Sequence, residues 1–193
     1  MPLKRGFKTQ ANRMSIAARK ELGLAPYARL CPWKLAKKHG VFVEDMSKLR
    51  PDDGAMLAAL APGERGTSPF SAGTVVLEGR HLIVMNDLHS RRRQASDLAH
   101  ELAHILCGHT PCGLLADGTR LFPQDDEDEA NELGPALLLS EPQTLRIADE
   151  GLNDAQAADR LGLTVEVVRM RMNSTGARRR IQFSRSRYQT RPA

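Results

Sequence analysis

The segment of the chain that precedes its most distinctive motif has a strand-like pattern of hydrophobic residues. Residues 74–78 and 81–86 are rich in valine, leucine and isoleucine, and they flank Gly79 and Arg80. Two such runs around a short glycine-containing turn are typical of a β-hairpin. Residues 41–46 form another short run of the same kind. The pattern therefore predicts a small β-sheet.

Elsewhere apolar residues recur every three or four positions, which is typical of amphipathic helices. The predicted helices cover residues 14–22, Pro32 to just before Gly40, a segment that begins after Asp87 or Ser90 and ends at Gly108, and residues 125–139, 142–150, 154–161 and 165–172. The last two have the spacing of a helix-turn-helix, a unit that serves packing as often as it reads DNA. We expect residues 1–13 to be unstructured. Strands followed by helices indicate an α+β fold.

The composition is consistent with one globular domain and a small appendage. Of the 193 residues, 41% are hydrophobic but only 4% are aromatic, which predicts a core of aliphatic side chains. We divide the chain into a main domain at residues 1–145, a helical extension at residues 146–176 and a basic, flexible tail at residues 177–193. The net charge of +5 is uneven, because residues 176–193 contain arginines and no acidic residue. Such a tail suits nucleic acid or an acidic partner, although a solvated terminus is the commoner case.

Cellular location follows from what the sequence lacks. No run approaches the roughly 20 apolar residues that span a bilayer, and no apolar segment follows the basic N-terminus as in a signal peptide. Cys31, Cys107 and Cys112 form an odd, sparse set that fits a reducing compartment. We therefore expect a cytoplasmic protein that does not interact with membranes.

The chemistry of the chain centres on an H-E-x-x-H motif in the helix that ends at Gly108. His100 and His104 lie four residues apart, so a helix places them on one face, where two imidazoles can share a tetrahedral zinc ion. Glu101 can then act on a bound water as general base. By itself the motif is only moderately specific.

A site with two histidines needs a third protein ligand. Glu127 comes 23 residues after His104, in the acidic start of the next predicted helix, and the intervening loop allows the two helices to lie side by side. An acidic first turn is also common without any metal. Cys107 and Cys112 with His109 match no closed structural zinc motif, and we assign Cys107 to the core.

The motifs together resemble the ImmA/IrrE-type zinc metallopeptidases. The matching segments are H-E-L-A-H-I-L-C-G-H at residues 100–109 and E-D-E-A-N-E-L at residues 127–133, followed by L-L-L-S-E-P at residues 137–142. The similarity extends over roughly residues 34–142. It implies a zincin-like fold, in which helices pack on a small twisted, mostly antiparallel sheet with a helical extension.

The resemblance also implies roles for individual residues. His100, His104 and Glu127 would bind Zn²⁺, Glu101 would be the catalytic base, and Asn131 would orient a ligand histidine, with Glu129 as the fallback ligand. The chain is similar to stand-alone members, which implies cleavage of a separately encoded helix-turn-helix repressor or antitoxin-like protein to relieve transcriptional repression. His109 and Tyr188 are weak candidates for stabilising the oxyanion.

Two further hypotheses concern the substrate and the class of protein. The edge strand at residues 74–77 can hold a peptide by backbone hydrogen bonds, as an added strand. The competing class is a non-catalytic regulator with a structural zinc, closed by His109 or a cysteine, whose C-terminal helices and basic tail bind DNA or a protein. A protease that needs a partner or signal for its activity is a third possibility.

Overall fold

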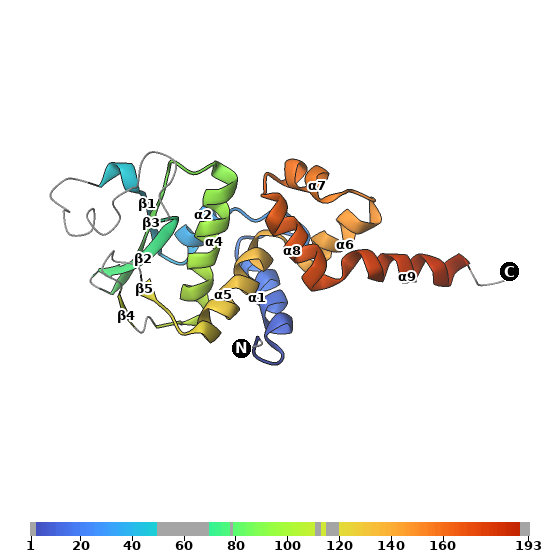
Figure 1. Cartoon of the computed structure of the whole chain (residues 1–193), viewed down its shortest axis with the longest axis horizontal. Coiled ribbons are helices and arrows are strands. Elements are labelled where there is room, and N and C mark those ends of the chain that lie inside the picture. The colour runs from blue at the N-terminus through green and yellow to red at the C-terminus, as the bar shows by residue number, and fades with distance from the viewer. Residues whose placement is uncertain (1–2, 50–69, 78, 111–112, 115–119, 190–193) are drawn as a thin grey trace.

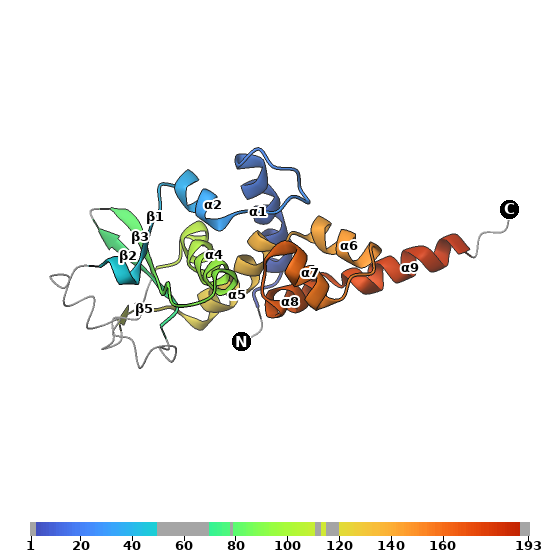
Figure 2. The ribbon, with the colours of Figure 1, turned by 90° about the horizontal axis from the view of Figure 1, so that it is seen from above.

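The computed structural model describes residues 3–49, 70–77, 79–110, 113–114 and 120–189. The helices are α1 (Phe7–Glu21), α2 (Pro32–Lys38), the short 3-10 helix η1 (Met46–Lys48), α4 (Arg91–Cys107), α5 (Gln124–Leu138), α6 (Glu141–Asp149), α7 (Asp154–Leu161), α8 (Val165–Thr175) and α9 (Ala177–Gln189). The strands are β1 (Phe42–Asp45), β2 (Ala72–Leu77), β3 (Arg80–Met85), β4 (Gly113–Leu114) and β5 (Arg120–Leu121). The three-stranded sheet lies at one end of an elongated molecule, α4 and α5 lie in the middle, and α9 projects from the other end (Figure 1, Figure 2). The expected α+β fold is confirmed.

The main sheet is mixed, which corrects the expectation of a mostly antiparallel one. Its strand order is β1-β3-β2; β3 pairs with β2 antiparallel and with β1 parallel. The hairpin turn contains Gly79 at φ 76°, a left-handed conformation that glycine adopts without strain. The hairpin pattern determines only the β2–β3 pairing. A strand of four residues such as β1 is too short for its sequence pattern to reveal its orientation.

Helix α4 carries the H-E-x-x-H motif and packs between two hydrophobic cores. Leu98 and Leu102 belong to a core shared with α1, α2, the sheet and α5. Ala95 and Ala99, on another face of α4, belong to a second core shared with α6, α7 and α8. Residue 145, where we expected a boundary, lies inside α6. The C-terminal helices are thus packed directly against the helix that bears the motif.

The N-terminal segment is helical, contrary to the expectation that residues 1–13 are unstructured. Helix α1 begins at Phe7, whose side chain is 3% exposed, and Ala11 on the next turn is fully buried. These two residues, four apart, place one face of a mostly polar segment in the first core. Within the described residues, no helix has the length and apolar character needed to cross a bilayer.

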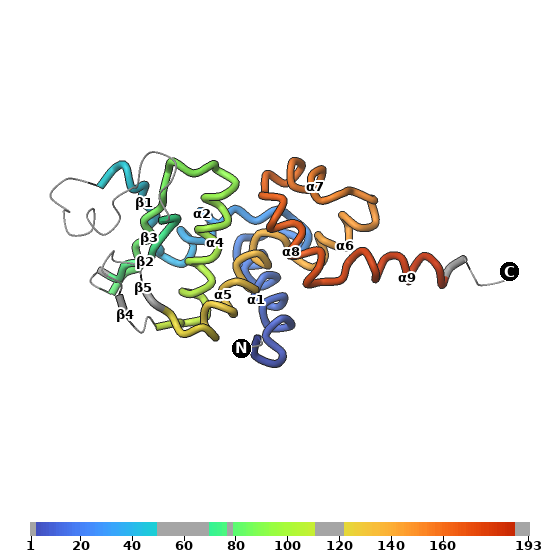
Figure 3. Tube along the Cα trace, in the orientation of Figure 1, coloured from blue at the N-terminus to red at the C-terminus, as the bar shows by residue number. Residues whose placement is uncertain are grey.

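The basic segment at residues 177–189 is also a helix rather than a flexible tail, and it runs on from α8 away from the body of the molecule (Figure 3). Its arginines pair with acidic residues of the preceding helices. The pairs are Arg178–Asp154 at 2.7 Å, Arg185–Asp149 at 2.9 Å and Arg180–Glu141. Much of the positive charge that suggested a nucleic-acid contact is therefore already paired within the chain.

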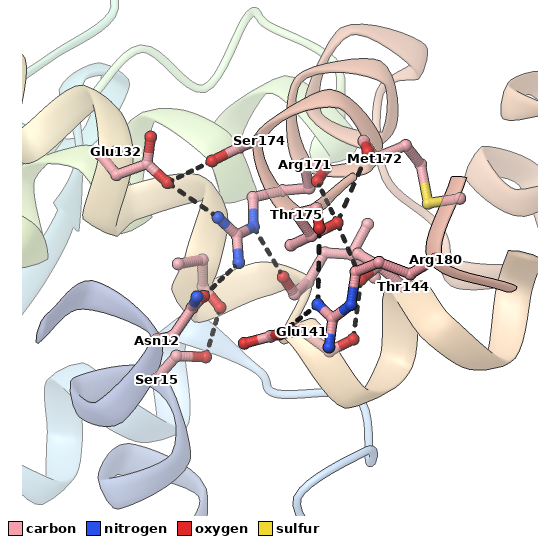
Figure 4. A network of polar contacts seen from close by, with 12 residues as sticks. Asn12, Ser15, Glu132, Glu141, Thr144, Arg171, Met172, Ser174, Thr175 and Arg180 are labelled. Atoms are coloured by element: carbon pink, nitrogen blue, oxygen red, sulfur yellow. Dashed lines mark hydrogen bonds and ion pairs between the residues drawn. The ribbon is translucent and has the colours of Figure 1, made fainter. Parts of the chain in front are cut away.

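Two buried arginines close the C-terminal end of α5. Arg171, from α8, donates through Nε to the carbonyl of Leu139, through Nη1 to Glu132 and through Nη2 to Asn12 of α1 (Figure 4). Arg19, from α1, donates to the last carbonyls of α5. A helix leaves its final carbonyl groups without intrahelical partners, and cations are favoured at that end. These contacts join α1, α5 and α8 into one body.

Candidate metal centre

Helices α4 and α5 bring together the three residues that the sequence predicted as metal ligands. The Nε2 atoms of His100 and His104 are 3.1 Å apart. The Glu127 carboxylate, in the first turn of α5, lies 3.4 Å from the former nitrogen and 3.6 Å from the latter. The ring of His104 is almost fully buried, whereas 29% of the His100 side chain and 32% of the Glu127 side chain are exposed. The cluster therefore opens to solvent on one side.

A glycine in α5 permits this close approach. A Cβ atom at Gly134 would lie 3.1 Å from the Cα of His100 and 3.2 Å from the carbonyl oxygen of Ala99. Only a residue without a side chain fits here without moving α5 away from α4. Because Glu127 lies about two turns before Gly134 on the same helix, this contact brings the carboxylate close to the histidine pair.

The donor set fits a four-coordinate metal ion. Zinc with bonds of about 2.0–2.1 Å to nitrogen and oxygen holds tetrahedral ligand atoms about 3.3–3.4 Å apart. The three donor separations of 3.1, 3.4 and 3.6 Å bracket that value. Three protein donors, of the His₂Glu type, also leave one position of a tetrahedron for a water or a substrate.

Burial keeps both imidazoles neutral, as metal ligands must be. Desolvation, together with the neighbouring His100 and His109, lowers the pKa of His104 to about 3. Desolvation also lowers the pKa of His100, against the opposing effect of Glu101 and Asp97. Burial raises the pKa of Glu127. Without a cation, the cluster thus disfavours charge on every one of its members.

Glu101, the predicted base, is adjacent to this cluster and is held by the sheet. The hydroxyl of Thr74, on β2, donates a 2.6 Å hydrogen bond to Oε2 of Glu101. In the described part of the chain, β2 lies at an edge of the three-stranded sheet. The edge strand and the carboxylate are therefore in direct contact.

The fallback ligand, Glu129, lies on the opposite side of His104. Its carboxylate is 3.2 Å from Nε2 of His109, and Nδ1 of His109 is 3.0 Å from Nδ1 of His104. His109 therefore contacts the Nδ1 edge of the His104 ring, whereas Glu127 faces Nε2, and Glu129 lies behind His109. This placement does not fit Glu129 as the third ligand, nor His109 as a fourth ligand or as a group that faces a substrate.

The side chain of Asn131, which we expected to orient a ligand histidine, is exposed on α5 and, among the described residues, makes no polar contact with either histidine. One helical turn separates it from Glu127, but that spacing carries it past the α4 interface toward solvent. Cys107 packs at the margin of the first core, as expected, and burial raises the pKa of its thiol to about 11. Cys112 and the side chain of Tyr188 lie outside the described residues.

Two residues hold His104 and His109 in place, and the sequence analysis identified only one of them, Gly108, as the end of the helix. Phe122, just after β5, stacks on the His104 ring with the centroids 3.8 Å apart and the planes 23° apart. Gly108 ends α4 at φ 71°, and the next amide, of His109, donates back to the carbonyl of His104. A glycine after the last helical residue is the usual signal for such a reversal. It was visible in the sequence, whereas nothing there indicated the contact of Phe122.

Comparison with known proteins identifies the family. The family model of the IrrE N-terminal-like domain matches residues 57–173, which is more than half of the chain. No curated protein and no solved structure matches the chain. The matched range contains the whole H-E-x-x-H motif, Glu127, helices α4 to α7 and most of α8, so the predicted resemblance is confirmed. The chain belongs to the M78 family of metallopeptidases.

Proposed function

We propose that this protein is a zinc-dependent endopeptidase in which His100, His104 and Glu127 hold the metal ion. The observation that supports this most directly is the convergence of these three donors beside Glu101, with spacings that suit a tetrahedral ion. A zinc ion held there would supply Lewis acidity, polarising the carbonyl group of a peptide and lowering the pKa of water.

In this proposal Glu101 moves the protons of the reaction. It accepts a proton from the water whose oxygen attacks the peptide carbonyl carbon, and it returns that proton to the amine nitrogen as the C–N bond breaks. Thr74 holds Oε2 of Glu101 through its hydroxyl, and so fixes the carboxylate relative to the sheet. His100 and His104 contribute lone pairs and keep no charge of their own.

The proposed substrate is a protein segment in extended conformation. Strand β2 lies at the edge of the sheet, and one of its residues contacts the catalytic carboxylate. A peptide that adds to this edge would run beside Glu101, with backbone hydrogen bonds providing most of the grip. By its resemblance to the family, the chain would cleave a helix-turn-helix repressor or antitoxin-like protein, which would relieve transcriptional repression.

The experiment that tests the proposal separates metal binding from catalysis. In Glu101→Gln, the metal content should match that of the wild type, while cleavage of a helix-turn-helix repressor substrate should fall by about 10²–10⁴-fold. Glu127→Ala should lose the metal, and Glu129→Ala should largely keep it, with a reduced affinity. Metal analysis and mass spectrometry of the cleavage products give both readouts. Normal cleavage by Glu101→Gln would reject the assigned base, and metal retention by Glu127→Ala would reject the assigned ligand.

Asp125→Asn is a matched control for the glutamate variants. Asp125 lies in the same first turn of α5, is exposed, and is not among the clustered donors. The substitution removes one negative charge near the site without removing a ligand. Its metal content and cleavage rate should equal those of the wild type.

A further inference from the structure

We propose that His109 and Glu129 form a positioning relay that holds His104 in the tautomer whose proton is on Nδ1 and whose Nε2 lone pair faces His100 and Glu127. This inference rests on the metal site proposed above. Two contacts carry it: Glu129 Oε2 to His109 Nε2 at 3.2 Å, and His109 Nδ1 to His104 Nδ1 at 3.0 Å. The side chains are enclosed, since those of His109, Glu129 and His104 are 6%, 14% and 3% exposed.

With an ionised Glu129 and a neutral His109, the protons in this chain of contacts have one consistent arrangement. An ionised carboxylate only accepts hydrogen bonds, so the His109 Nε2–H group donates to Glu129. A neutral imidazole carries a single N–H group, so Nδ1 of His109 is then an acceptor. The remaining proton of the contact belongs to Nδ1 of His104. The lone pair of His104 is therefore on Nε2, the atom that lies 3.1 Å from Nε2 of His100.

The local backbone places His109 where the relay requires it. Gly108, in its left-handed conformation, turns the chain back at the end of α4, and the amide of His109 bonds the carbonyl of His104 at 3.0 Å. Stacking by Phe122 then fixes the plane of the His104 ring. Because both the ring plane and the partner of Nδ1 are fixed, Nε2 has one direction in which to point. Partners of this kind commonly orient histidine ligands in metal sites.

His109 and Glu129 also belong, together with Cys107, to a second group of possible metal donors. A cation bound to Nε2 of His109 would take its lone pair and move the His109 proton to Nδ1. Nδ1 of His104 would then have to accept, and the His104 proton would occupy Nε2, between His100 and Glu127. A cation bound at the second group therefore removes the Nε2 lone pair of His104, and the group of His100, His104 and Glu127 loses one of its metal donors. The relay predicts a single metal ion per chain.

The test combines the tautomer of His104 with the affinity for zinc, in the full-length chain. In the metal-free wild type, ¹⁵N chemical shifts of the His104 ring should report a proton on Nδ1. His109→Leu should lose that preference, and its zinc affinity, measured by competition with a chromophoric chelator, should fall by about 10–100-fold. His109→Gln should restore most of the affinity, because a glutamine amide can accept from His104 and donate to Glu129.

Variants of the carboxylate extend the test. Glu129→Gln keeps an acceptor for His109 and should bind zinc nearly as well as the wild type, while Glu129→Leu should weaken binding. Asp125→Asn is the control for the loss of charge. Equal affinities for His109→Leu and His109→Gln would show a packing role and overturn the relay. A His104 proton on Nε2 in the metal-free wild type would overturn it as well, as would two zinc ions per chain.

These outcomes distinguish the relay from the proposed function. A wild-type protein that binds one zinc ion, together with an unaffected His109→Leu variant, rejects the relay and leaves the peptidase proposal intact. A wild-type protein that binds no zinc rejects the proposed function, and the tautomer of His104 in the metal-free protein still decides the relay.

Discussion

Two polar clusters inside the molecule differ in how their donors and acceptors balance. In the cluster around Arg171, each of the three nitrogen atoms of the guanidinium group meets an oxygen atom of Leu139, Glu132 or Asn12 (Figure 4). In the metal centre, the atoms that face one another are two imidazole nitrogens and a carboxylate. The first cluster supplies its own cation. The second collects lone pairs that a cation from solution can satisfy.

The difference separates a structural cluster from a binding site. A buried charge stabilises a fold only where hydrogen bonds and an opposite charge compensate its loss of hydration. The Arg171 cluster meets that requirement within the chain, so its stabilising contribution is present whenever the protein is folded. The metal centre meets it only after a ligand arrives. We therefore expect the two clusters to respond in opposite ways to substitution and to chelators.

The largest expected effect comes from removing the cation of the closed cluster. Arg171→Met leaves the Glu132 carboxylate, whose side chain is 13% exposed, without its cationic partner and with the Ser174 hydroxyl as its remaining donor, so the free energy of unfolding should fall by about 3–5 kcal/mol. Chemical denaturation with a chelator present measures this. Under the same conditions Glu127→Ala should change the free energy of unfolding little, because in the metal-free protein Glu127 is one of several hydrogen-bond acceptors that lie close together.

The double variant Arg171→Met/Glu132→Leu sharpens this comparison. It removes both charges, and it should recover part of the stability that the single variant loses. A single Arg171→Met variant within 1 kcal/mol of the wild type would contradict the structural role of the cluster. So would a Glu127→Ala variant that is destabilised in the metal-free state as strongly as Arg171→Met.

The residues of the candidate metal centre are easier to recognise in the sequence than the contacts that surround them. His100, His104 and Glu101 are encoded by spacing on one helix, and helical geometry alone brings them together. Glu127 followed from the need for a third ligand and from the family motif. The roles of these residues, and of Asn131, stay predictions. The close approach of α5 to α4 at Gly134 depends on a tertiary contact with His100, which no sequence pattern reveals.

At both ends of the chain, contacts between distant residues again limited what the sequence could predict. Phe7 and Ala11 anchor α1 in the first core, but two apolar residues in a polar segment do not stand out in a sequence pattern. The arginines of α9 were predicted to be solvated, because their acidic partners Asp149 and Asp154 belong to α6 and α7. Helix boundaries in the same region were predicted closely, since the caps at Asn153 and Thr164 are local signals.

A smaller effect, on the dependence of stability on pH, tests the neutral histidines of the metal centre. The pKa of His104 is about 3 in the folded protein, against an ordinary value of 6.5. Between these values the unfolded chain binds the proton more readily than the folded chain, so stability falls as the pH is lowered from about 6.5 to about 3. This residue contributes at most about 1.4 kcal/mol per pH unit in that window.

Denaturation of the metal-free protein at several pH values measures the slope. His104→Gln should reduce it, and His81→Gln, on strand β3, serves as the matched histidine control. An unchanged slope in His104→Gln would mean that His104 accepts its proton in the folded state. That result would contradict the inference that burial keeps this imidazole neutral and able to bind a metal ion.

The smallest expected effect concerns the exposed ion pairs of α9. Arg185 and Asp149 are 59% and 65% exposed at their side chains, so water and salt screen their attraction. Arg185→Gln should lower the free energy of unfolding by no more than about 1 kcal/mol, and the difference should shrink as salt is added. Zinc affinity should stay at the wild-type value, because α9 docks on α6 and contributes no atom to the metal centre. If Arg185→Gln lowered the free energy of unfolding as much as Arg171→Met, then the docking of α9, rather than the buried cluster of Figure 4, would hold the C-terminal helices against the rest of the molecule.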